Sequence, residues 1–144
     1  MLKINPHLNF GGNTEDAFKF YKSIFGGEFA VLQRVKDTPE AGRVPEKEKD
    51  KIMHVSLPVG NGNTLMVGDA LESTGHKLNV GNNIQLSVEA DSKKEVDRLF
   101  TGLSAGGKVT MPLADTFWGA YFGMVTDKFG VQWMVSYSKP QESK

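Results

Sequence analysis

Two histidines stand in segments of alternating residue type, and imidazole is the side chain best suited to proton transfer near neutral pH. His7 is flanked at two-residue spacing by Asn5 and Asn9, and His54 stands two residues before Ser56. Alternation with a period of two indicates strands with one buried face, so these polar side chains are expected to point away from the core. His7 and His54 are therefore the candidate catalytic residues. The alternative for His54 is a hydrogen-bonded structural imidazole.

The second half of the chain offers amides and aromatic rings. Asn83 and Gln85 alternate with apolar residues, which predicts a second polar strand face. Such a neutral face suits a wet pocket lined by hydrogen-bonding groups, and the alternative is a sheet surface that simply faces solvent. Trp118 and Phe122 could form flat walls for an aromatic or conjugated ligand. Aromatic residues are more often core, and Trp133 is expected to be buried structure.

The composition limits the classes of function. The chain has 144 residues, which fits one domain, and its 17 basic residues balance its 17 acidic ones. A balanced charge does not indicate the basic surface that nucleic-acid binding requires. The absence of cysteine excludes disulfides, thiolate catalysis and cysteine-based zinc sites. No apolar run reaches the roughly 18 residues of a membrane span, and there is no signal-peptide core. We therefore expect a cytoplasmic protein without nucleic-acid or membrane partners.

The sequence predicts two helices that are preceded and followed by similar residues. Asn13 precedes the first by the spacing of a capping box, and Ser92 precedes the second in the same way. Paired glycines end both helices, as left-handed C-caps do. Period-two segments and turn signals give the other elements. The expected strands cover residues 4–10, 29–35, 52–59, 63–69, 84–89, 109–113, 117–126 and 131–137, with an exposed, mobile loop at 37–51, a linker at 71–83 and a frayed tail at 139–144.

The two halves match one another. The helical stripes, caps and terminal glycines superpose when Asn13 is aligned with Ser92, and the preceding strands match when Leu8 is aligned with Leu86. Each half then consists of a strand, a helix and three strands. The alternative is two unrelated β-α stretches within an α+β domain.

Several segments resemble the vicinal-oxygen-chelate superfamily, and in particular its PhnB-like branch, often labelled 3-demethylubiquinone methyltransferase-like. The similar segments are residues 9–13 (NFGGN), 17–21 (AFKFY), 25–28 (FGGE), 109–113 (VTMPL), 115–119 (DTFWG), 122–127 (FGMVTD) and 129–133 (FGVQW). The resemblance spans about residues 3 to 137. It implies an α+β fold of two βαβββ modules whose curved mixed sheets surround an open cup. The expected single domain, 1–144, comprises modules 1–70 and 84–138, the linker 71–83 and the tail 139–144.

The resemblance also implies positions at which metal ligands would be expected. Metal-dependent members of the superfamily place one His or Glu on the first and last strand of each half. The matching positions here are Asn5, Met66, Asn83 and Met134. Amide and thioether groups are poor ligands for hard divalent cations, so we expect neither a catalytic metal nor another cofactor. A slip in the alignment of the first strand would bring His7 into play, but one histidine is not a metal site.

Two functions remain. The first is a non-catalytic module that binds an unidentified small molecule, like the superfamily's antibiotic-binding members, which implies a homodimer. The second is a lyase, isomerase or dioxygenase acting on a small oxygenated metabolite, with His7 or His54 as base or as a displaced metal ligand. The methyltransferase label finds no support, because the chain lacks the glycine-rich strand-to-helix turn expected of an S-adenosylmethionine enzyme. The expected ligand-binding residues are Asn5, His7, Asn9, His54, Ser56, Asn83, Gln85, Trp118, Phe122 and Met134.

Overall fold

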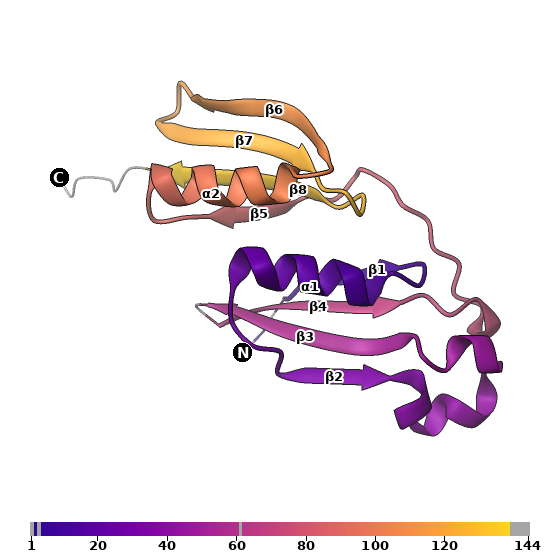
Figure 1. Cartoon of the computed structure of the whole chain (residues 1–144). Coiled ribbons are helices and arrows are strands. Elements are labelled where there is room, and N and C mark those ends of the chain that lie inside the picture. Colours follow the sequence, from indigo (N-terminus) through magenta and orange to yellow (C-terminus); the bar gives the residue numbers. More distant parts are fainter. Residues whose placement is uncertain (1, 3, 61, 139–144) are drawn as a thin grey trace. The chain divides into compact units, whose positions relative to one another are not determined.

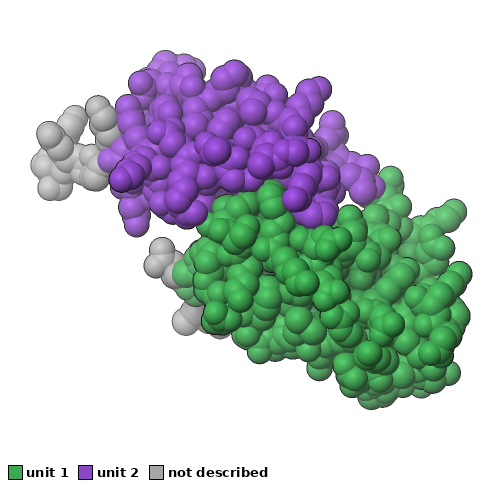
Figure 2. All heavy atoms as spheres, viewed as in Figure 1, with its two compact units in different colours: residues 1–79 green, residues 80–144 purple. Residues whose placement is uncertain are grey.

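A computed structural model describes residues 2, 4–60 and 62–138. The chain divides into two compact units, residues 1–79 and 80–144 (Figure 2). Each unit contains one four-stranded mixed sheet with a helix lying along one face (Figure 1). Among the described residues, no helix is both long and apolar enough to cross a membrane. The expected tail, 139–144, lies outside the described residues.

The first unit has the predicted order of strand, helix and three strands. It comprises β1 (His7–Phe10), α1 (Thr14–Phe25), β2 (Val31–Arg34), β3 (Ile52–Gly60) and β4 (Asn63–Asp69). The strands lie in the order β1-β4-β3-β2, and β1 runs parallel to β4 while the other pairs are antiparallel. Strand β1 therefore reaches its partner through the helical crossover that a parallel pair requires.

The second unit repeats this arrangement. It comprises β5 (Leu86–Glu89), α2 (Lys93–Ser104), β6 (Lys108–Asp115), β7 (Ala120–Thr126) and β8 (Gln132–Ser138). Its strand order, β5-β8-β7-β6, is that of the first sheet, with β5 parallel to β8. The predicted α+β class and the repeated βαβββ module are thus confirmed. Both sheets are open, and the prediction that together they surround a cup stays a prediction.

Apolar stripes on the helices hold each unit together. Helix α1 buries Ala17, Phe18, Tyr21 and Ile24. The sheet contributes its own buried apolar residues, which are Phe10, Val55, Leu57, Leu65 and Val67. Burying a large apolar side chain stabilises a fold by about 1.5–3 kcal/mol, so this layer supplies most of the driving force for the unit. The alternate residues of the strands lie on the face of the sheet opposite α1.

The two helices begin in different ways. Ser92 accepts a hydrogen bond from the backbone N–H of Glu95 at 3.1 Å, which confirms the predicted cap of α2. Asn13 makes no such bond, and its predicted capping role is wrong. Asp69 takes its place: one carboxylate oxygen accepts from the N–H groups of Gly12 and Thr14 at 3.0 and 3.1 Å. The first helix is therefore capped from the end of β4, far away in the sequence.

The segment 37–51, predicted as an exposed loop, is mostly exposed but contains short helical turns and two buried side chains. It contains the 3-10 turns η2 (Pro39–Arg43) and η3 (Glu46–Glu48), and η1 (Val35–Asp37) leads into it. Val44 packs with Val35 and Leu71 in a small buried cluster. Glu48 is only 2% exposed, and its carboxylate accepts hydrogen bonds from Ser73. Buried apolar contacts and an internal partner for the acid outweigh the polar composition of the segment.

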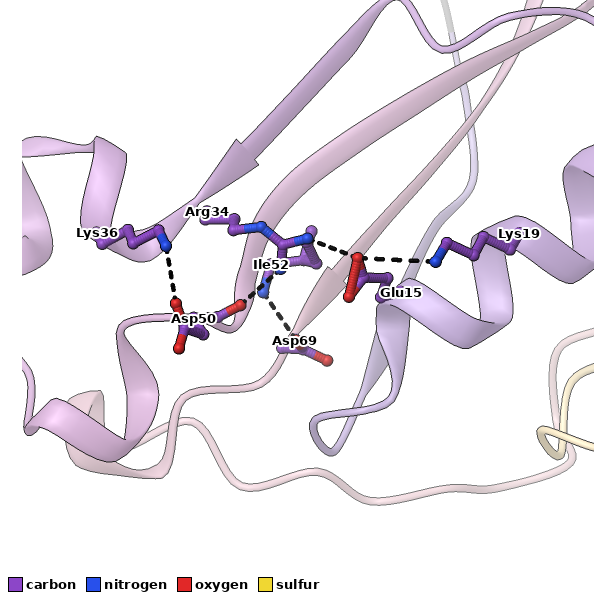
Figure 3. A network of polar contacts seen from close by, with 7 residues as sticks. All are labelled: Glu15, Lys19, Arg34, Lys36, Asp50, Ile52 and Asp69. Carbon is purple, nitrogen blue, oxygen red and sulfur yellow. Dashed lines mark hydrogen bonds and ion pairs between the residues drawn. The ribbon is translucent and has the colours of Figure 1, made fainter.

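Polar contacts join Asp50 of this segment to Lys36 and to Arg34 at the end of β2, and an ion pair joins Arg34 to α1 (Figure 3). Arg34 at the end of β2 donates to the Glu15 carboxylate at 2.5 Å and to the backbone carbonyl of Asp50 at 2.9 Å. The hydrogen bond from Arg34 lowers the pKa of Glu15 below its ordinary value. Lys36 contacts the Asp50 carboxylate at 3.0 Å. The Lys36 and Asp50 side chains are largely exposed, so we attribute to their ion pair positioning rather than much stability.

Several strands are shorter than their alternation indicated. The ladder of β1 begins at His7 rather than residue 4, and that of β5 begins at Leu86 rather than residue 84. Phe117 was expected within a strand but lies in the turn before β7, where its side chain is almost fully exposed. The alternation of polar and apolar residues extends beyond the residues that pair with a neighbouring strand. It therefore predicts strands that are longer than the paired ladders.

Candidate functional site

Two imidazoles meet on the face of the first sheet opposite α1. His7 projects from β1 and His54 from β3, and β4 lies between those strands. Their ring centroids are 5.6 Å apart, with the planes inclined by 24°. Gly68 on β4 makes this approach possible. A Cβ at Gly68 would lie 3.4 Å from His7 Cε1 and 2.8 Å from the Met53 carbonyl oxygen, so a larger residue would crowd the pair.

The residues around the pair follow from the strand registers. Met66 lies directly opposite His7 on one side and opposite Ser56 on the other. Residues that face one another across neighbouring strands share a side of the sheet. Asn9 lies opposite Gly68 and so joins the same face. We call His7, Asn9, His54, Ser56 and Met66 the imidazole face.

The electrostatics of this face favour a neutral His7. The pKa of His7 is lowered from 6.5, first because the ring is partly removed from water and second because His54 repels its protonated form. His76 adds a smaller repulsion. Burial disfavours the charged imidazole, and a neighbouring imidazolium does so too. His7 can therefore accept a proton or a hydrogen bond at neutral pH.

Within each unit, the two expected metal positions are not paired with each other in the strand ladders. Asn5 precedes β1, and its side-chain oxygen accepts a hydrogen bond from the N–H of Thr64 at 3.2 Å. The residue opposite Met66 is His7, and the residue opposite Met134 is Ser87. The expected equivalence of Met66 with Met134 would make His7 equivalent to Ser87, whereas the sequence match of the two halves assigned His7 to Gln85, so the two expectations are not compatible with these ladders.

The donors at these positions do not suit a divalent metal of the superfamily type. The four side chains are two amides and two thioethers, and one amide oxygen is already engaged by Thr64. Within the described part of the chain, no group of three or more His, Cys, Asp or Glu residues could hold a metal ion. The residues present thus do not fit that metal.

The second sheet presents thioethers and an aromatic ring on the face opposite α2. Met134 on β8 lies opposite Met124 on β7, which in turn lies opposite Met111 on β6. Phe122 stands two residues before Met124, on the same side of the strand, and faces Ser136. We call Met111, Phe122, Met124 and Met134 the thioether face.

An aromatic cluster borders the thioether face. Trp118 is 59% exposed and lies edge-on to Phe122, with ring centroids 6.0 Å apart. Phe117 packs against Trp118 in the same manner at 4.9 Å. Trp133 is 3% exposed and donates its indole N–H to Asp127 at 2.8 Å, so the prediction that it is buried structure is confirmed.

The remaining predicted residues lie at the start of the second unit. Asn83 is exposed and precedes β5. Gln85 is half-buried, and its side-chain oxygen has no hydrogen-bond partner among the described residues. The structure thus brings together two sets within its separate units. They are His7, Asn9, His54 and Ser56 in the first, and Trp118, Phe122 and Met134 in the second.

Sequence reasoning missed Gly68, the role of Asp69 and the placement of Met66 opposite His7. A signal for Gly68 was present, because a glycine inside a strand often marks a close approach of other groups. Asp69 carried no comparable signal, since its partners lie 17 to 57 residues away. The pairing of Met66 with His7 depends on register, which alternation leaves undetermined.

Residues 2–136 match a family model described as 3-demethylubiquinone-9 3-methyltransferase. The crystal structure of protein PA1353 from Pseudomonas aeruginosa has a TM-score of 0.85 and 42% identity, and the match covers 96% of this chain and 98% of that one. A putative 3-demethylubiquinone-9 3-methyltransferase, PhnB protein, from Bacillus cereus has a TM-score of 0.75 and 28% identity over 95% and 100%. Protein YjdN of Escherichia coli is 29% identical over 99% of this chain and all of its own length.

A more distant structure shows the fold alone. A glyoxalase/bleomycin resistance protein/dioxygenase family enzyme from Burkholderia phytofirmans has a TM-score of 0.60 at 17% identity, covering 91% of this chain and 95% of that one. The fold expected from the sequence is therefore confirmed by likeness to a solved member of that group.

Proposed function

This chain belongs to the PhnB-like family described as 3-demethylubiquinone-9 3-methyltransferase, with the glyoxalase/bleomycin-resistance fold, and on that premise we propose that it binds a small organic molecule without a catalytic metal. The observation that carries the proposal is the imidazole face, where polar groups gather around Gly68 on the side of the sheet opposite α1. Such convergent donors and acceptors are typical of ligand sites.

The thioether face supports an organic ligand with an apolar or aromatic part. Methionine side chains are flexible and polarizable, so they adapt to ligands of irregular shape. Exposed Trp118 beside Phe122 adds flat aromatic surface. The fold gives no support to methyl transfer, because both sheets are largely antiparallel and neither is the doubly wound parallel sheet of a nucleotide-binding domain.

The second candidate is an enzyme of the glyoxalase superfamily type, acting as a lyase, isomerase or dioxygenase. One observation favours it: His7 has a lowered pKa and stands beside His54, the arrangement expected of a general base with a partner. Activity that requires an added metal and is lost in His54→Ala would decide for this candidate and against simple binding.

We further propose that the protein acts as a cytoplasmic homodimer. The cysteine-free sequence supports a reducing compartment, where disulfides have no use. The exposed aromatic side chains Phe117 and Trp118 supply apolar surface that a second copy could cover. Light scattering of the purified chain at several concentrations tests the dimer. A dimeric mass is expected, and a monomer at all concentrations would refute it.

Native mass spectrometry after incubation with a cell metabolite extract tests the binding function. We expect a discrete adduct on the wild-type chain that is weakened in His54→Ala, whose side chain lies on the imidazole face. Lys94→Ala is the matched control, because Lys94 is exposed on the first turn of α2. An adduct of equal intensity on all variants, or none on the wild type, would refute the proposal.

A further inference from the structure

Three methionines lie in one row across the second sheet. Met111 on β6 is paired with Met124 on β7, and Met124 is paired with Met134 on β8. Residues directly opposite each other on neighbouring strands have Cβ atoms roughly 4.5–5.5 Å apart, so the three thioethers are neighbours on one side of the sheet. The chain contains no cysteine, and any oxidation of its sulfur therefore takes place at methionine.

Met111 is the member of this row that solvent reaches most readily. It is 46% exposed, whereas Met124 and Met134 are half-buried. It also lies on the outer strand of the sheet, between two irregularities in the register of β6 with β7. Such irregularities bend a strand and redirect its side chains. The other methionines that the structure describes, Met53 and Met66, are half-buried in the first unit.

We propose that Met111 is a site of reversible oxidation by hydrogen peroxide. The lone pair of Sδ attacks one peroxide oxygen, so that an S–O bond forms while the O–O bond breaks. The sulfur is oxidised to the sulfoxide and the peroxide is reduced, and the departing hydroxide takes the proton of the transferred oxygen and leaves as water. A methionine sulfoxide reductase restores the thioether with electrons from a thiol.

This oxidation changes the chemistry of the thioether face. A thioether is flexible and apolar, whereas a sulfoxide is polar and chiral. The new oxygen is introduced beside Met124, the paired neighbour of Met111, and one strand further from Met134. The modification does not depend on ligand binding at the imidazole face, which lies in the other unit, so either can fail without the other.

The first test follows the full chain in dilute hydrogen peroxide by tandem mass spectrometry of its tryptic peptides. Among the methionines of residues 2–138, Met111 should gain an oxygen atom first, and methionine sulfoxide reductase should remove that atom. Met111→Leu should abolish this fastest reaction, and Met53→Leu is the matched control that should leave the rate at Met111 unchanged. Faster oxidation of any other methionine within residues 2–138, or a sulfoxide that the reductase does not reduce, would overturn the proposal.

The second test asks whether the sulfoxide forms within the row. In a chain with isotopically labelled methionine methyl groups, oxidation of Met111 should shift the resonance of Met124 most and that of Met134 less. The resonances of Met53 and Met66 should stay in place, and an unchanged circular dichroism spectrum would show that the fold is retained. An unmoved Met124 resonance, or equal shifts in both units, would contradict the proposal.

Discussion

At the scale of single residues, the imidazole face depends on a glycine, Gly68. Gly68 has no Cβ, and this lets imidazoles from two strands that are not neighbours approach each other across a third. Alternation in the sequence predicted that His7, Asn9, His54 and Ser56 lie on polar strand faces. That they share one side of the sheet was therefore predictable. The contact between His7 and His54 was not, because it depends on the order of strands.

The pH behaviour of His7 provides a first prediction. Nuclear magnetic resonance of its Hε1 proton should report a pKa below 6.5, because burial and His54 both oppose protonation. His54→Ala should raise the pKa of His7 but leave it below 6.5, since burial is the largest cause. A His7 pKa above 6.5 in the wild-type chain would contradict this assignment.

The same shift affects folding stability. The unfolded chain takes up a proton at His7 near 6.5, while the folded chain takes it up only at lower pH. The contribution of His7 to stability should therefore fall as the pH drops from 6.5 towards its folded pKa. His7→Phe should remove this part of the pH dependence in urea denaturation measured between about pH 5 and 7.5.

Gly68→Ala provides a second prediction. Its methyl group would lie 2.8 Å from the Met53 carbonyl oxygen, a backbone atom that cannot move cheaply. Overpacking of this kind costs about 1–3 kcal/mol. Gly42→Ala is the control, because nothing lies within 4 Å of its added carbon. Urea denaturation should therefore show a loss for Gly68→Ala alone, and equal stability of the two variants would contradict the account.

At the scale of elements, α1 is held by a residue that no local pattern revealed. The buried carboxylate of Asp69 accepts hydrogen bonds from Gly12 and Thr14 at the start of the helix and from the N–H of Ile52 on β3 at 2.9 Å. It thereby joins the helix to both central strands. The cap of α2 by Ser92 was predictable, because both partners lie within one helical turn. Capping from a distant strand leaves no such local signature.

Asp69→Ala should destabilise the chain more than any change at Asn13. Removing the carboxylate leaves three backbone N–H groups without their acceptor. Hydrogen bonds to charged groups contribute about 1.5–3 kcal/mol each, so we expect the free energy of unfolding to fall by at least about 2 kcal/mol. Asn13→Ala should behave as an ordinary surface substitution and cost less than about 0.5 kcal/mol. A reversal of this order in urea denaturation would refute the assignment of the cap.

At the scale of the whole molecule, the duplicated βαβββ module was predictable from caps, stripes and terminal glycines that recur together. The strand registers were less predictable: the ladders cannot satisfy both the expected match of Met66 with Met134 and the expected match of His7 with Gln85. Helical periodicity fixes which residues share a stripe, but strand alternation leaves the register open to slips that keep each residue on its face. The same ambiguity concealed the pairing of Met66 with His7.

The two units have also diverged in chemistry while keeping one topology. The face opposite the helix carries imidazoles and amides in the first unit and thioethers with an aromatic ring in the second. The two faces are therefore expected to recognise different chemical groups. Function resides in the side chains that the fold displays.

Chemical-shift mapping tests the central claim most directly. Backbone and methyl resonances of the labelled full chain would be compared before and after addition of the metabolite fraction that yields the adduct. We predict that shifts concentrate at His7, Asn9, His54 and Ser56 on the imidazole face, and that the exposed residues of α1 and α2 do not respond. Shifts confined to the outer surfaces of the two helices would contradict the account.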